Sequence, residues 1–353
     1  MALSSPGDST WSGAANVCGK IEGNPAECRS SRCDAASLRR CITALPSNQT
    51  PLGAKPARFR RLRLLIVGCG DVGLRIVKRL PLSSGVGVKV MALTSSPQRR
   101  AELRADGVVP LLGNLDQPAS LHRLAGIAHR VIHLAPPPGE GWIDARTRAL
   151  VAALARRSSP SDLVYASTSG VYGDCQGARV HETRAVQAQS ARAIRRIDAE
   201  ARVRHLGRSH HLRVSSLRIP GIYALDRPNG TPATRLQKGT PVLLPQDDVF
   251  TNHIHADDLA RACIAALWRG RAQRVYNVND DTGLKMGDYF DLAADILKLP
   301  RPPRVARSTA QEQLPLMLLS FMNESRRLNN TRMKQELRLN LHYPTVRSGL
   351  TAH

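Results

Sequence analysis

The chain lacks an apolar run of the roughly 18 residues that a membrane-spanning helix needs, and it lacks the apolar core of a signal peptide. Its seven cysteines show no C-x-x-C zinc spacing, so we expect reduced thiols and a cytoplasmic protein without disulfides. No H-E-x-x-H or G-x-S-x-G motif occurs, which argues against a metalloprotease and a serine hydrolase. Acidic pairs such as Asp257-Asp258 rarely converge on one ion, and Asp257 fits a helix N-cap, so we expect no metal site.

Acidic residues are also scarce. There are 28 Asp and Glu against 51 Lys and Arg, which gives a net charge of +23. Such a charge suits nucleic acid, but the arginines are spread along the chain, and the 4% aromatic content leaves few rings for base stacking. We therefore expect no specific nucleic-acid partner. Solvated arginine-rich faces explain the charge best, and anionic ligands such as phosphates are a second explanation.

A glycine-rich turn follows the first expected strand. The apolar run 62–67 leads into a G-x-G-x-x-G at residues 68–73, and an amphipathic helical pattern comes next. In such a turn the first glycine permits a tight bend, the second lets a diphosphate approach the backbone, and the third lets the helix pack on the strand. The helix start offers free N–H groups and a positive dipole end to phosphates. The residues expected at the diphosphate are Gly68, Gly70, Asp71, Val72 and Gly73.

Apolar runs and helical patterns alternate after residue 62. The expected strands are 62–67, 86–93, 108–112, 130–135, 163–167 and 212–217. The expected helices between them include 98–105, 118–124 and 188–206. This alternation predicts an α/β fold of the Rossmann type, with a doubly wound parallel sheet and a smaller C-terminal substrate lobe. In the looser C-terminal third, helices are expected at 232–238, 256–268 and 286–298, with a strand near 274–278.

The second expected strand ends without the carboxylate that binds the ribose 2′-hydroxyl in NAD-binding folds. It ends instead in Thr94-Ser95-Ser96, and Arg99 and Arg100 follow. A guanidinium group binds phosphate as a fork, so Thr94 and Arg99 favour the 2′-phosphate of NADP, with NAD as the alternative. Solvated helix arginines are the competing interpretation.

Four further segments resemble those of one enzyme family, in the family's order. Residues 165–174 (YASTSGVYGD) resemble its S-S/T-x-x-V-Y-G-D segment, and residues 133–135 resemble its H-L-A. Residues 217–223 and 252–260 resemble its L-R-x-x-x-V-Y-G and I-H-V-x-D-x-A segments. Over about residues 62–345 the chain is therefore similar to the extended short-chain dehydrogenases, the NAD(P)-dependent epimerase/dehydratase group.

The resemblance implies roles for several residues. Thr168 corresponds to the family's catalytic Ser/Thr, whose hydroxyl bonds the reacting oxygen of the substrate and steadies charge on it. Ala135 and Pro136 would lie along the nicotinamide ribose. Asn114 and Leu115 would contact the adenine.

One departure from the family concerns its Y-x-x-x-K pair, in which the tyrosine transfers the proton. Alignment on the family's K-x-x-x-E places Arg192 at the tyrosine and Arg196 at the lysine. Arginine is a poor general acid, since its pKa exceeds ~12, so we expect both residues to supply positive charge to an oxyanion or a phosphate. A second departure is Val67, which replaces the first glycine of the family's G-x-x-G-x-x-G. Both departures indicate an atypical branch.

Substitute proton donors are present in the sequence, but a structural role is favoured for each. We expect Tyr172 to pack in a turn and His133 to be a hydrogen-bonded core histidine. His253 and His255 alternate as on a strand, so one of them is expected to face solvent. Tyr223 is the fifth candidate donor, and a structural role is favoured for it too.

The sequence thus predicts an NAD(P)-dependent oxidoreductase or epimerase that acts on a carbonyl or sugar-nucleotide substrate. The alternative is a non-catalytic NADP(H)-binding regulatory protein that lacks the Tyr/Lys pair. Residues 1–60 are expected to be a disordered extension, 61–225 the dinucleotide-binding domain, and 226–353 the substrate lobe and C-terminal tail. The resemblance also suggests a homodimer, because members of the family often form dimers by pairing helices of the two subunits.

Overall fold

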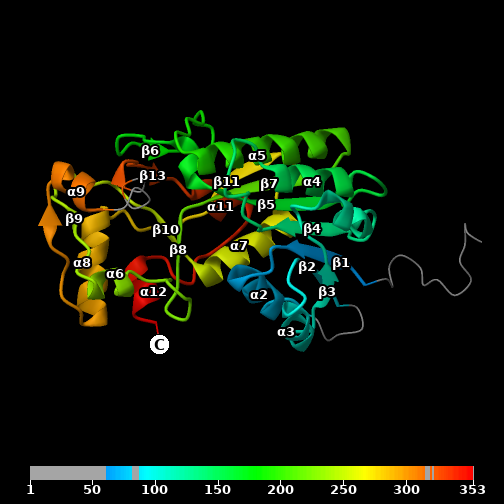
Figure 1. Ribbon diagram of the computed structural model, residues 1–353, viewed down its shortest axis with the longest axis horizontal. Coiled ribbons are helices and arrows are strands. Elements are labelled where there is room, and N and C mark those ends of the chain that lie inside the picture. Colours follow the sequence, from blue (N-terminus) through cyan, green and yellow to red (C-terminus); the bar gives the residue numbers. More distant parts are fainter. Residues whose placement is uncertain (1–60, 82–86, 315–318, 320–321, 353) are drawn as a thin grey trace, which may run out of the picture. The chain divides into compact units, whose positions relative to one another are not determined.

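Seven parallel strands form the central sheet of the computed structural model, which describes residues 61–81, 87–314, 319 and 322–352 (Figure 1). The order across the sheet is β3 (Val109–Leu112), β2 (Lys89–Thr94), β1 (Arg63–Val67), β4 (Arg130–His133), β5 (Asp162–Thr168), β7 (Arg213–Ile219) and β11 (Arg274–Asn277). The chain order reverses between β1 and β4. In open sheets of this kind, ligands bind beyond the carboxyl ends of the strands at such a switch point.

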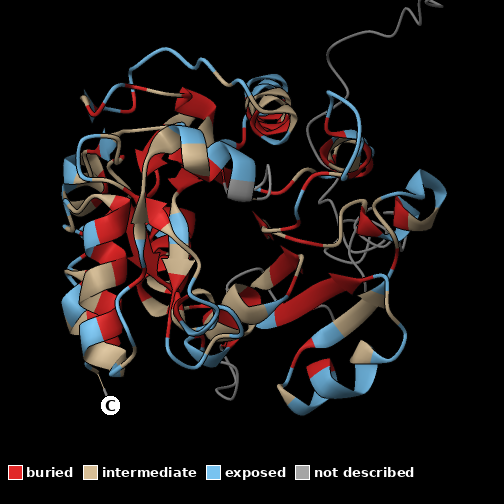
Figure 2. Cartoon of the chain, turned by 60° about the vertical axis from the view of Figure 1, so that its left-hand side comes forward, coloured by how far each residue is buried: buried red, intermediate tan, exposed pale blue. Residues whose placement is uncertain are grey.

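Helices cover both faces of the sheet, because alternate residues of each strand point to opposite sides. Leu64 and Ile66 of β1 belong to an apolar layer with helices α2 (Asp71–Lys78), α3 (Arg99–Ala105) and α7 (Ala256–Arg269). Leu65 and Val67 belong to a second layer with η2 (Pro118–Leu124), α4 (Ala145–Leu154) and α5 (Ala191–Ser209). Figure 2 shows the strands as mainly buried and the helices as buried on one side. The expected doubly wound α/β fold is confirmed.

The sheet also takes elements from beyond residue 225. Helix α7 packs on α2, and β11 pairs with β7 at the edge of the sheet. The sheet is therefore not confined to the expected segment 61–225. The reason is that β11 buries Val275 and Tyr276 where β7 would otherwise be an uncovered edge.

The rest of the C-terminal part forms a smaller lobe around its own apolar cluster. Its elements are β8 (Gly221–Tyr223), α6 (Ala233–Gln237), β9 (Val242–Leu243), β10 (His253–His255), α8 (Met286–Leu297), β12 (Arg304–Val305), α9 (Arg307–Gln313) and α12 (Val346–Leu350). Three elements lie elsewhere: β6 (Arg179–Val180) pairs with β13 (Arg327–Leu328), and α11 (Thr331–Glu336) packs on β11.

The chain divides into two units, Met1–Arg58 and Phe59–His353, and every described residue lies in the second. The expectation of disorder for residues 1–60 falls outside the described residues. Among the helices that the structure describes, none has the length and apolar character needed to cross a membrane.

Candidate dinucleotide site

The glycine turn lies at the switch point between β1 and β4. Gly68 has a φ of +85°, and a Cβ there would lie 2.5 Å from the backbone N of Ala135, so glycine is required for the close approach of the two strand ends. A Cβ on Gly73 would meet Cys69 Sγ at 3.1 Å and Ile66 at 3.5 Å, which shows how tightly the helix packs on the strand. At Gly70 a Cβ would meet nothing within 4 Å. The turn is thus closed on its protein side and open at Gly70.

The first turn of α2 has N–H groups to offer a ligand. No side chain caps this helix, and within the described chain the N–H groups of Asp71, Val72 and Gly73 have no recorded acceptor. The Asp71 carboxylate, which would repel a phosphate, accepts a hydrogen bond from Arg75 Nε at 2.9 Å. Open space at Gly70 and free N–H groups at a helix start are what a diphosphate requires, so the turn fits a dinucleotide.

Arg75 also joins α2 to the lobe. Its guanidinium binds Asp257 Oδ1 at 2.7 Å and Asp226 Oδ1 at 2.6 Å. The expectation that Asp257 is an N-cap is wrong: it lies in the first turn of α7, and His255 Nδ1 accepts the hydrogen bond from its N–H. Burial raises the pKa of Asp257, but the hydrogen bond from Arg75 and the positive charges of Arg79 and Arg75 together lower it by more, so the net shift is downward.

The end of β2 supplies the residues expected at the adenosine ribose. Thr94 is buried, and its hydroxyl is engaged with the backbone of Ser96, so it shapes the turn more than it presents a free group. Arg99 is partly exposed, and its Nη1 donates to Cys69 O at 2.9 Å. The structure thus brings Arg99 onto the glycine turn.

The loops after β3 and β4 carry the remaining expected contacts. Leu115 packs against the second apolar layer, and Asn114 Oδ1 accepts from Asp116 N. Ala135 is buried beside Gly68, whereas Pro136 is exposed.

Sequence reasoning missed the residue that joins these loops: Arg146 of α4 binds both oxygens of Asp116 at 2.7 Å and donates to Pro136 O at 3.3 Å. Its partners lie 10 and 30 residues away, so no local signal marked it.

Thr168 lies at the carboxyl end of β5, and Arg196 contacts the same strand two residues earlier. Thr168 ends the strand, and its hydroxyl accepts from Gly170 N at 3.3 Å in the short helix η3 (Ser169–Tyr172). Arg196 Nη1 donates to Ala166 O at 2.6 Å, two residues before Thr168. Arg192 lies one turn earlier on α5 and is exposed. Its pKa is lowered by partial burial of the guanidinium and by the positive charges of Arg196 and Arg195.

Two expected structural residues behave as expected. Tyr172 is buried and donates from its hydroxyl to Asn277 Oδ1 at 2.7 Å. His133 is buried with Nε2 2.9 Å from Thr147 Oγ1, and burial followed by the charge of Arg196 lowers its pKa to about 3. Neither is placed to transfer a proton to a substrate.

His253 and His255 correct the sequence expectation, because both are buried and neither faces solvent. His253 stacks on Tyr289 with ring centroids 4.1 Å apart, and His255 stacks on Tyr343 at 3.8 Å. Tyr223 presents its ring edge to both. Residues 253 and 255 are two apart and so lie on the same face of β10. Aromatic rings from distant parts of the chain cover that face.

His253 should make folding sensitive to acid. Burial, and then the charge of Arg235, lowers its pKa to about 3. The unfolded chain takes up this proton near pH 6.5 and the folded chain does not, so stability should fall as pH drops from 6.5 toward 3, by up to about 1.4 kcal/mol per pH unit. His253→Phe should make this dependence shallower.

Urea unfolding of wild type and His253→Phe at pH 7 and pH 5 measures this contribution. His205→Phe, at an exposed position on α5, is the matched control and should keep the wild-type pH dependence. An unchanged difference between the two pH values in His253→Phe would show that this histidine is protonated in the folded chain.

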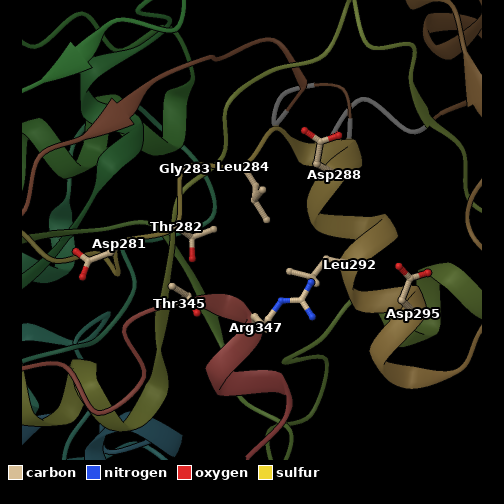
Figure 3. Close-up of a pocket in the computed structure, with 9 residues that line it drawn as sticks. All are labelled: Asp281, Thr282, Gly283, Leu284, Asp288, Leu292, Asp295, Thr345 and Arg347. Atoms are coloured by element: carbon tan, nitrogen blue, oxygen red, sulfur yellow. The ribbon is translucent and has the colours of Figure 1, made fainter.

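A separate pocket of about 530 Å³ lies in the C-terminal lobe (Figure 3). It is formed by residues 281–284 together with side chains of α8 and with Thr345 and Arg347. None of the residues predicted from sequence to bind cofactor or substrate lines it. The predicted residues gather instead at the carboxyl edge of the sheet.

Comparisons with known proteins agree with this architecture. The NAD dependent epimerase/dehydratase family model matches residues 64–279, whereas no curated protein matches the chain. A conserved protein of unknown function from Silicibacter pomeroyi is 29% identical over 82% of this chain and 96% of that one, with a TM-score of 0.66.

Two solved enzymes share the fold at lower identity. UDP-glucose 4-epimerase from Thermotoga maritima, solved with UDP-glucose, is 17% identical over 82% of this chain and 96% of its own, with a TM-score of 0.65. dTDP-glucose 4,6-dehydratase from Bacillus anthracis, solved with NAD, is 16% identical over 82% and 94%, with the same TM-score of 0.65. The match of the family model over most of the chain, on this fold, shows that the chain belongs to the NAD dependent epimerase/dehydratase family.

Proposed function

We propose that the protein is an NAD(P)-dependent oxidoreductase or epimerase of the cytoplasm that acts on a carbonyl or sugar-nucleotide substrate. The observation that carries the proposal is the open position at Gly70, beside the uncapped start of α2. A turn that served only to join strand and helix would have no need of an empty approach to its backbone. When bound there, the dinucleotide supplies an acceptor or donor of hydride.

Four segments, each following one of the strands β1 to β4, would share the binding of the dinucleotide. Residues 68–73 hold the diphosphate, and the end of β2 with Arg99 holds the adenosine ribose. Asn114 and Leu115 contact the adenine, and Ala135 and Pro136 border the nicotinamide ribose. Arg146 binds Asp116 and Pro136 O, and so fixes the loop after β3 relative to the loop after β4.

At the reacting end, Thr168 orients the substrate oxygen through its hydroxyl. Arg196 and Arg192 stabilise negative charge that develops on that oxygen. Both arginines stay charged, so the proton comes from solvent water rather than from a tyrosine side chain. Tyr165 is no substitute, because burial raises its pKa to about 12 and its hydroxyl accepts from Arg196 at 3.2 Å.

We further propose NADP as the preferred cofactor. Arg99→Ala should weaken NADPH binding roughly tenfold, because a charge-assisted bond to the 2′-phosphate is lost, and should change NADH binding by less than about twofold. Calorimetric titration of both nucleotides against the purified chain measures this. Arg104→Ala removes the same charge from an exposed position on α3 and should leave both affinities unchanged.

Three outcomes of that titration decide the matter. Tighter binding of NADH than of NADPH by wild type would refute the preference for NADP. Equal losses for both nucleotides in Arg99→Ala would show that Arg99 does not contact the 2′-phosphate. If neither NADH nor NADPH binds to the wild-type chain, the proposed function is wrong.

The alternative is a regulatory protein that binds NADP(H) without turnover. It is favoured by one observation: no tyrosine or histidine is placed at the first turn of α5, where the family has its proton donor. Nucleotide binding without NADPH oxidation or sugar-nucleotide epimerisation across a broad substrate panel would support it. An activity of wild type that Thr168→Ala abolishes would exclude it.

A further inference from the structure

The first two turns of α5 carry three arginines, Arg192, Arg195 and Arg196, which we call the α5 arginine cluster. Arg195 and Arg196 are only 6% and 8% exposed. Arg195 Nη1 donates to Gly141 O in the loop after β4, and Arg196 Nη1 donates to Ala166 O at the end of β5. The Nε atoms of both are buried without a hydrogen-bond partner. The cluster therefore keeps unused donors inside the protein.

The cluster also lacks a counter-ion. Of the three buried arginines among the described residues, only Arg218 has one: its guanidinium binds both oxygens of Glu200. No carboxylate in the described part of the chain forms a salt bridge with any arginine of the α5 arginine cluster. A buried charge without a partner is costly, and two of them on one helix repel each other as well. A bound anion would relieve both costs.

The place of the cluster shows which ligand would supply that anion. A Cβ on Gly170 would lie 3.7 Å from Ala193 Cβ and 3.7 Å from Thr168 Oγ1, so the first turn of α5 packs on the turn that begins at Thr168. An anion held by Arg192 would thus be a near neighbour of the substrate oxygen that Thr168 orients. Charges of the dinucleotide belong at the glycine turn, at the other end of the site.

We infer that the substrate carries a carboxylate or phosphate group close to its reacting carbon–oxygen bond, and that the α5 arginine cluster binds this group. The inference rests on the proposed function for the position of the substrate. It narrows the substrate class from carbonyl compounds in general to anionic ones. The arginines that stand where the family has its proton donor would then select the substrate as well as stabilise charge on its reacting oxygen.

Matched pairs of ligands test the inference on the full chain, both without nucleotide and with NADPH in excess. Pyruvate with hydroxyacetone tests a carboxylate, glyceraldehyde 3-phosphate with glyceraldehyde tests a phosphate, and UDP-glucuronate with UDP-glucose tests a carboxylate on a sugar nucleotide. In at least one pair the anionic member should bind roughly tenfold or more tightly than its neutral partner by calorimetry. The pair that discriminates identifies the anion.

Arg192→Gln should abolish that discrimination, and Arg192→Lys should restore part of it. Arg192 is exposed, so these variants keep the fold, which substitutions of the buried Arg195 and Arg196 would put at risk. Arg208→Ala is the matched control, because it removes one charge from an exposed position near the other end of α5. It should discriminate as wild type does.

Equal affinities within all three pairs, or discrimination that survives in Arg192→Gln, would overturn the inference. A titration of NADPH alone keeps it separate from the proposed function. Normal NADPH binding without anion discrimination refutes the anionic substrate and leaves the dinucleotide site intact. Discrimination that depends on Arg192 without any NADPH binding supports the anion site and refutes the proposed function.

Discussion

Gly70→Ala should bind NADPH and NADH roughly tenfold or more weakly than wild type, because a methyl group would then stand where the diphosphate approaches the backbone. The fold should tolerate the change, since a Cβ at Gly70 meets no protein atom within 4 Å. Calorimetry measures the two affinities, and thermal unfolding without nucleotide measures the stability of the folded chain. We expect the thermal midpoint of the variant to equal or slightly exceed that of wild type.

Gly68→Ala is the structural counterpart of this variant. Gly68 has a φ of +85°, and its Cβ would lie 2.5 Å from Ala135 N, so alanine should lower the thermal midpoint of the free protein. The pair therefore separates an effect on the ligand from an effect on the fold. Wild-type affinity in Gly70→Ala would mean that no diphosphate lies at the start of α2.

The sheet could be predicted from the sequence because its strands carry their own signal. β1, β2 and β5 are buried on both faces, which requires nearly unbroken apolar runs, and the glycine turn after β1 fixes the point where the helix begins. The six strands predicted up to residue 217 occur in the structure with ends shifted by a few residues. Local sequence suffices where the strand is fully buried.

The lobe could not be predicted equally well, because its strands are short and its burial comes from distant residues. β9 and β12 have two residues each, too few for any periodic pattern. The rings that bury His253 and His255 belong to Tyr289 and Tyr343, far along the chain. Strand alternation places His253 and His255 on one face, but it does not say whether that face is covered, so the expected solvent exposure of one histidine was wrong.

In the candidate site, too, some residues could be predicted from the sequence and others could not. The glycines are recognisable from their G-x-G-x-x-G spacing after a buried strand, and Thr168 from the resemblance of its segment to that of the family. Arg195 resembles a solvated helix arginine in sequence, and only the loop that brings Gly141 onto it makes it buried. Its neighbour Arg196 was singled out by the resemblance to the family's K-x-x-x-E, which ends at Glu200, and both residues are buried in the structure.

That acid, Glu200, should be the most sensitive position for stability. It is 4% exposed, and it accepts hydrogen bonds from Ser167 Oγ at 2.5 Å, and from Arg218 Nη2 at 2.8 Å and Nε at 3.1 Å. Glu200→Gln keeps the volume but removes the charge, which leaves Arg218 buried without a counter-ion. We expect a loss of about 3–5 kcal/mol in the free energy of unfolding, measured by urea denaturation.

Two further variants show whether this loss comes from the unpaired charge. Asp295→Ala breaks an exposed ion pair with Arg301 and should cost less than about 1 kcal/mol. The double variant Glu200→Gln with Arg218→Met removes both charges, and it should be more stable than Glu200→Gln alone because no buried cation remains unpaired. A urea midpoint of Glu200→Gln equal to that of wild type would show that Arg218 is solvated in the folded chain.

A double variant no more stable than Glu200→Gln would mean that the stability is lost through packing around Ser167 and not through the unpaired charge. If the double variant recovers, a buried guanidinium in this fold needs a carboxylate partner. Arg195 and Arg196 have no such partner among the described residues, so this result would support an anion bound at the α5 arginine cluster.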